Sequence, residues 1–169
     1  MVIKASVVFL LLVISMQVSA DMSALMSHAA KKHNVPEHVL KAVCTWESQT
    51  YSAGKRQPWP WTLNVAGDPA YFRSYYGAAI ALNKAILSGI ENIDIGMCQI
   101  NWYWHKSRFK KASELLIPKV NVEYASAYLR ELKTKDRTWQ ETIGRYHSPG
   151  CASCAQAYSQ RVLQLKNLM

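Results

Sequence analysis

The sequence predicts a mainly α-helical α+β fold with a small β-hairpin insertion. Apolar residues recur at helical spacing through most of the chain. Prolines and glycines interrupt that spacing between residues 54 and 69, where a short alternating pattern indicates strand and loop. The sequence shows no internal repeat, low-complexity tract or linker-like stretch. We therefore expect one domain over residues 21–169, a length that suits a single hydrophobic core.

Residues 1–20 have the pattern of a cleaved secretory signal peptide. Lys4 gives a basic start, residues 7–14 are apolar, and residues 18–20 form a small-residue ending. An uncleaved anchor is the alternative, but the apolar run is far shorter than the roughly 20 residues that span a bilayer. We therefore expect export to the periplasm or cell envelope, with no stable membrane span after cleavage.

Two helices are expected before the insertion. Residues 23–33 have helical spacing and stop at Asn34. Pro36 suits the first position of a second helix, which the apolar spacing carries towards Tyr51.

The insertion is expected to contain two paired strands. Residues 61–65 alternate through Trp61, Leu63 and Val65, and Ile93 and Ile95 alternate in the same way after a break. Between them, residues 75–88 return to helical spacing and stop at a glycine.

Further helices are expected after residue 100. Asn121 is expected to cap one of them, and Thr138 with Glu141 forms a capping box at the start of the next. A final helix carries Tyr158 and Val162 on its apolar face.

The chain is basic, with a net charge of +9. A spread positive surface favours a polyanionic partner. We do not expect nucleic acid, because the basic residues are scattered among apolar positions and no nucleic-acid motif accompanies them. An exported protein also meets the cell-wall polymer, whose peptide carboxylates are a second possible target for such a surface.

The cysteines are Cys44, Cys98, Cys151 and Cys154. In an oxidising compartment disulfides are the expected state, and three pairings are possible. Cys151 and Cys154 with His147 upstream could instead be part of a zinc site, but a closed site needs four ligands and the sequence shows no second pair. We therefore expect neither a metal nor a cofactor.

Glu47 is the candidate for acid–base chemistry. It shares a helix face with Leu40, Val43 and Cys44, directly before a loop rich in tryptophan and tyrosine, side chains that stack on sugar rings. A glutamate can deliver a proton near neutral pH only if burial raises its pKa from about 4.3. The alternative is a partly exposed glutamate at a helix end, which is the common situation for this residue type.

Three motifs in this sequence resemble the signature of a known family. Glu47-Ser48 is followed by Gly-Met-Cys-Gln-Ile-Asn at residues 96–101 and by Ile-Gly-Arg-Tyr-His-Ser at residues 143–148. In this order and spacing they resemble the lytic transglycosylases related to goose-type lysozyme, over nearly all of residues 21–169. Pro-Trp-Pro-Trp-Thr-Leu-Asn at residues 58–64 is similar to the branch that accompanies conjugation, pilus and type IV secretion machines.

The resemblance implies a lysozyme-like fold whose β-hairpin lines a substrate cleft. It implies that Glu47 is the catalytic acid and base and that Ser48 supports it. Tyr146 is implied to form a hydrogen bond near Glu47. The residues implied to line the sugar site are Met97, Gln99 and Asn101.

Two departures from the family pattern stand close to the site. The usual Gly-Leu-Met-Gln is Gly-Met-Cys-Gln here, and the usual Ala-Tyr-Asn is Arg-Tyr-His at residues 145–147. His147 therefore either serves the site or caps a helix. If the family fold holds, Cys44 and Cys98 approach each other and form a disulfide, and Cys151 and Cys154 close a small loop. Two buried free thiols at Cys44 and Cys98 are the alternative.

The family reaction cleaves the β-1,4 bond of peptidoglycan glycan strands. Glu47 would protonate the glycosidic oxygen and then remove the proton from the 6-hydroxyl of N-acetylmuramic acid, which leaves a 1,6-anhydromuramyl end. The family also implies a monomer that opens the wall for a secretion or conjugation apparatus.

Three alternatives to this function remain open. Asp94 could act as a second carboxylate and make the enzyme a lysozyme-like hydrolase. The chain could be a noncatalytic wall-binding component of an assembly. It could also be a secreted toxin that uses the same chemistry on competitor walls.

Overall fold

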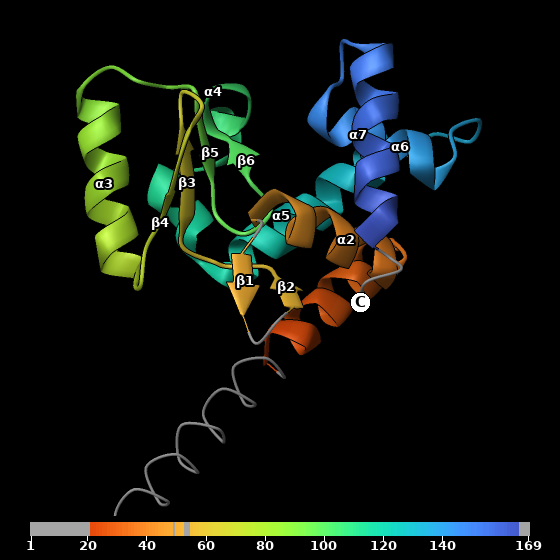
Figure 1. The fold of residues 1–169 in the computed structure, drawn as a ribbon, viewed down its shortest axis with the longest axis horizontal. Helices are drawn as coiled ribbons and strands as arrows, with labels where there is room; N and C mark the ends of the chain where they lie inside the picture. Colours follow the sequence, from red (N-terminus) through yellow and green to blue (C-terminus); the bar gives the residue numbers. More distant parts are fainter. Residues whose placement is uncertain (1–20, 49, 53–54, 166–169) are drawn as a thin grey trace, which may run out of the picture.

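The structure, a computed structural model, describes residues 21–48, 50–52 and 55–165 (Figure 1). The signal peptide expected over residues 1–20 lies outside the described residues. A helical segment over residues 21–32 comes first. The elements that follow are α2 (Glu37–Ser48), β1 (Thr50–Ser52), β2 (Lys55–Gln57), β3 (Thr62–Val65), β4 (Asp68–Tyr71), α3 (Tyr75–Leu87), β5 (Ile93–Ile95), β6 (Ile100–Asn101), α4 (Trp102–His105), the 3-10 helices η1 (Lys106–Arg108) and η2 (Ala112–Leu116), α5 (Pro118–Leu132), α6 (Trp139–His147) and α7 (Ala152–Gln164).

The predicted class, mainly helical with a small antiparallel sheet, is confirmed. β1 and β2 form a separate hairpin, and the other four strands have the order β4-β3-β5-β6. The expected pairing of the two alternating segments is present, with Leu63 opposite Ile95. Figure 1 shows this sheet between α3 on one side and α2, α6 and α7 on the other. No helix among the described residues is long and apolar enough to cross a membrane.

Two element boundaries differ from the sequence expectation. The second helix ends at Ser48, and Thr50 to Ser52 already form β1, because they pair with Lys55 to Gln57 of β2. Pro69 belongs to β4 and not to a loop. A proline fits there because β4 is the edge strand of its sheet, where a missing N–H leaves no gap in the hydrogen-bonding ladder.

The expectation that Asn121 caps a helix is wrong. α5 begins at Pro118, and Asn121 lies inside the helix with 1% of its surface exposed. Its side chain accepts a hydrogen bond from Cys98 N (2.9 Å) and donates to Ile95 O (2.8 Å) and Leu115 O (2.9 Å). These bonds satisfy the backbone of the turn between β5 and β6, so the amide holds the turn against α5. The Thr138–Glu141 capping box is confirmed at the start of α6.

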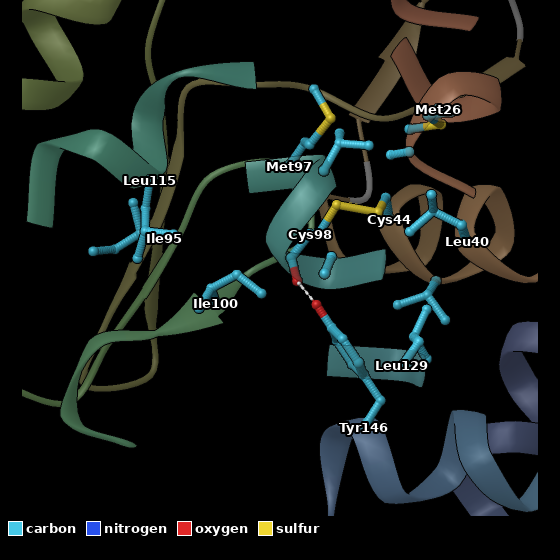
Figure 2. Packing of buried hydrophobic residues seen from close by; sticks show 14 of the residues in the cluster. Met26, Leu40, Cys44, Ile95, Met97, Cys98, Ile100, Leu115, Leu129 and Tyr146 are labelled. Atoms are coloured by element: carbon cyan, nitrogen blue, oxygen red, sulfur yellow. Dashed lines mark hydrogen bonds between the residues drawn. A yellow bond between two sulfur atoms is a disulfide. The ribbon is translucent and has the colours of Figure 1, made fainter. Parts of the chain in front are cut away.

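The hydrophobic core joins the helices to the inner strands (Figure 2). Leu40 on α2, Ile95 on β5 and Leu129 on α5 are fully buried within it. The Cys44–Cys98 disulfide crosses this core and links α2 to the turn before β6. The C-terminal half of α2, which ends one residue after Glu47, is therefore attached to the sheet covalently as well as by packing.

Candidate active site

A groove of about 1080 Å³ lies between the sheet and the helices. Its walls come from α2, β3, β5, α5, α6 and α7, so distant parts of the chain meet there. Of the predicted site residues, it brings together Glu47, Ser48, Gln99, Asn101, Tyr146 and His147, and Asp94 also lines it.

Glu47 lies at the last turn of α2, with its carboxyl at the groove. The apolar stripe that precedes it is buried, as the helical spacing predicts: Leu40, Val43 and Cys44 are all fully buried. The Glu47 side chain itself is 13% exposed, which leaves a small opening towards the groove. Its Oε1 accepts a hydrogen bond of 2.5 Å from the Tyr158 hydroxyl.

Burial raises the pKa of Glu47 to about 8. The hydrogen bond from Tyr158 opposes this shift, and the nearby charge of Asp94 adds to it. At neutral pH Glu47 is therefore protonated. Because Oε1 accepts the bond from Tyr158, Oε2 is the oxygen free to carry the acidic proton.

The rings of His147 and Tyr158 stack beside the Glu47 carboxyl. Their rings are parallel, with an interplanar angle of 4° and centroids 4.5 Å apart. His147 Nδ1 lies 3.8 Å from Glu47 Oε1, and the His147 side chain is 55% exposed. Burial lowers the pKa of His147, and the charge of Asp94 opposes that shift. Of the two roles left open for His147, the geometry favours the site.

Asp94 and Asn101 face each other across β5 and β6. Asn101 Nδ2 donates to Asp94 Oδ1 (2.8 Å) and to Asn92 Oδ1 (2.9 Å). Burial raises the pKa of Asp94, while the bond from Asn101 and the proximity of His147 lower it. A second carboxyl group is thus held in the same groove as Glu47.

Gln99 is oriented by a strained backbone. Its φ is +48°, in the left-handed region that non-glycine residues rarely adopt. Its Nε2 donates to Gly96 O (2.7 Å) and lies 3.3 Å from Thr62 Oγ1. Such strain persists only where surrounding contacts fix the conformation, and it occurs often at ligand sites. Here the positive φ places the Gln99 side chain in the wall of the groove.

Ser48 and Tyr146 act on the backbone around Glu47. Ser48 Oγ donates to Cys44 O (2.8 Å) and accepts from Trp59 N (2.9 Å), so it fixes the end of α2 to the following loop. The Tyr146 hydroxyl donates to Cys98 O (2.7 Å; Figure 2). Burial, and after it the proximity of Glu47, raises the pKa of Tyr146. Tyr146 therefore lies near Glu47, as the resemblance implied.

Met97 differs from its expected role. It is fully buried and belongs to the hydrophobic core, not to the groove wall (Figure 2). The physical reason is the turn between β5 and β6: the hydrogen bonds of Asn121 hold this turn against α5, and Met97 points inward while Gln99 faces the groove.

The two disulfides implied by the resemblance are present. Cys44 pairs with Cys98, and Cys151 pairs with Cys154. Cys44 lies one helical turn before Glu47, and Cys98 directly precedes Gln99. Cys151 and Cys154 are bonded to each other and are not thiolates, so the zinc alternative loses two of its ligands.

Comparison of the chain with protein-family models, with curated proteins and with solved structures found no match.

Sequence reasoning placed Tyr158 on an apolar helix face but missed its role as the hydrogen-bond donor to Glu47. A buried tyrosine usually finds a partner for its hydroxyl, which was the available signal. A second group that was missed is a row of aromatic residues along another part of the groove. Tyr124 and Tyr128 are stacked at an angle of 11°, and the Tyr124 hydroxyl lies 2.8 Å from His105 Nδ1. The groove thus combines the protonated acid Glu47, two further carboxyl residues, Asp94 and Glu131, and an aromatic wall.

Proposed function

We propose that the chain is an exported peptidoglycan lytic transglycosylase with a lysozyme-like arrangement of its groove. The observation that carries this proposal is the Glu47 carboxyl, which is 13% exposed at the groove and has a pKa of about 8. A general acid must hold a proton at the working pH and be able to reach a substrate oxygen. Glu47 meets both requirements.

The first step is protonation of the glycosidic oxygen by Glu47. The bond to the departing sugar breaks, and Glu47 is left as a carboxylate. The carboxylate then removes the proton from the 6-hydroxyl of N-acetylmuramic acid, whose oxygen closes on the anomeric carbon. Glu47 donates a proton in the first step and regains one in the second. The reaction therefore consumes no water and needs no second acid or base.

The walls of the groove suit a chain of sugars. The aromatic row of Tyr124 and Tyr128 offers flat faces, and the amides of Gln99, in the turn before β6, and Asn101, in β6, offer polar contacts. Trp104, which is 75% exposed, extends the apolar surface at the groove. The net charge of +9 favours a polymer that carries carboxylates.

Export is supported by the chemistry of the cysteines. Both disulfides require an oxidising compartment to persist, which fits the periplasm or cell envelope. In that setting the substrate is the glycan strand of the wall, and local thinning for a secretion or conjugation apparatus is the proposed purpose.

The deciding experiment compares purified residues 21–169 with the Glu47→Gln variant on isolated peptidoglycan. We expect the wild type to release fragments and the variant to release none. Equal release by both proteins would remove Glu47 from the reaction, whereas no release by either protein would favour a binding or assembly role. The product ends are read by mass spectrometry, where the anhydro form is lighter than the hydrolysed form by one water.

A hydrolase is the second candidate, and Asp94 favours it. This carboxyl lines the same groove and its charge acts on Glu47. A second carboxylate could orient a water for attack. Reducing sugar ends in place of anhydro ends, together with their loss in Asp94→Asn, would select this reaction.

A further inference from the structure

His147 forms the outer layer of the site. Its side chain is 55% exposed, whereas Tyr158, on which its ring lies flat, is only 6% exposed. The parallel stacking, with ring centroids 4.5 Å apart, places the imidazole over the face of the tyrosine ring.

Glu47 and Tyr158 lie beneath the His147 ring. The Tyr158 hydroxyl is bonded to Glu47 Oε1 at 2.5 Å, and His147 Nδ1 lies 3.8 Å from the same oxygen. A separation of 3.8 Å is too long for a hydrogen bond, so the ring acts on the carboxyl by covering it and through its charge state. The exposed ring thus lies over two groups that are mostly buried.

We propose that His147 is a positioning residue, which as a neutral ring covers the Tyr158–Glu47 pair on the groove side and keeps the carboxyl of Glu47 away from water. This inference deepens the proposed function and rests on it for its catalytic meaning, but the cover itself can be measured without activity. The position is one where the sequence departs from the usual asparagine of the family it resembles.

Only a neutral His147 ring can favour the protonated form of Glu47. Burial is the main reason that Glu47 holds its proton, so a ring that excludes water favours the protonated acid. A protonated imidazole at 3.8 Å would instead stabilise the carboxylate. Burial lowers the pKa of His147, which keeps the ring neutral near pH 7. Other titratable or charged groups that line the groove with this pair include Asp94 from β5, Tyr124, Tyr128 and Glu131 from α5, Tyr146 from α6 and Arg161 from α7.

Two substitutions distinguish the effect of the His147 ring as a cover from the effect of its charge. His147→Phe retains a flat ring that cannot titrate, and His147→Asn removes the ring. The carboxyl carbon of Glu47 is followed by ¹³C NMR during a pH titration of residues 21–169. We expect the pKa of Glu47 to stay near its wild-type value in His147→Phe and to fall by on the order of one pH unit in His147→Asn. His38→Asn, the same chemical change at an exposed position of α2, is the control and should leave the titration unchanged.

The proposal is overturned if the pKa of Glu47 falls equally in both His147 variants, or if it stays constant in both. A melting temperature measured for each variant identifies a loss of folding, and His147→Gln replaces His147→Asn if the latter does not fold. The peptidoglycan assay keeps the two proposals apart. A shifted titration without any wall cleavage by the wild type contradicts the proposed function alone, whereas wall cleavage with an unchanged titration contradicts the cover alone.

Discussion

Tyr158 donates a hydrogen bond of 2.5 Å to Glu47, a residue 111 positions earlier in the chain. The bond joins α7 to the end of α2 at the wall of the groove. It stabilises the carboxylate form, yet burial outweighs it and the acid keeps a pKa of about 8. The site therefore holds its proton through exclusion of water, and the tyrosine limits how far the pKa rises.

Wall cleavage should decline on the alkaline side as Glu47 loses its proton. Because the pKa of the acid is about 8, we expect the rate to fall through that pH and to be nearly flat just below it. The measurement is the initial rate of fragment release at several pH values. An alkaline limb near pH 4.5 would mean that the working acid is an ordinary exposed carboxyl.

Tyr158→Phe should move that alkaline limb to higher pH. In the wild type the hydrogen bond from Tyr158 lowers the pKa of Glu47. Without that bond, burial raises the pKa of Glu47 further. We also expect a lower rate, since the carboxyl loses a contact that orients it. A pH profile that moves in the opposite direction would contradict this account of the site.

Burial of Glu47 should cost the folded protein stability as the pH rises. In the unfolded chain the carboxyl loses its proton near its ordinary pKa of 4.5, whereas the folded protein keeps it up to about 8. Between these values the unfolded state binds fewer protons, so the free energy of unfolding falls by a few kcal/mol and then levels off. Urea denaturation of the wild type and Glu47→Gln at both ends of this range tests it, because the glutamine variant should lack this fall.

Asn121→Ala should destabilise the protein strongly. The substitution leaves Cys98 N, Ile95 O and Leu115 O without the partner that satisfies them. Buried unsatisfied groups cost about 1–3 kcal/mol each, so a loss of at least about 2 kcal/mol is expected in urea denaturation. Asn64→Ala, at a partly exposed position in the middle of β3, serves as a comparison and should cost less.

A mild dithiol should open the two disulfides in a fixed order. Cys154 is exposed at the start of α7, whereas Cys44 and Cys98 are fully buried. Thiol–disulfide exchange requires access to a sulfur, so Cys151 and Cys154 should be alkylated first. Mass spectrometry of the alkylated peptides would show this order, and simultaneous reduction of both bonds would contradict it.

Local patterns in the sequence were sufficient to predict the helix that carries Glu47 and several of the elements around it. The buried stripe before Glu47 follows from helical spacing, and the Thr138–Glu141 box follows from the chemistry of a helix start. Asn121 and Met97 were placed wrongly because their environments depend on the turn between β5 and β6, whose contacts come from a distant helix. The role of Tyr158 was not predicted for the same reason, because its hydrogen-bond partner Glu47 lies 111 residues away.

The bond between Cys44 and Cys98 depends on the compartment in which the chain folds. It does not form where chains are synthesised under reducing conditions. A newly made chain therefore lacks the covalent tie between the helix that ends at the acid and the turn that presents Gln99. If the chain is the exported wall enzyme proposed above, this tie forms only after export, so the catalytic helix is braced against the turn only where the substrate is.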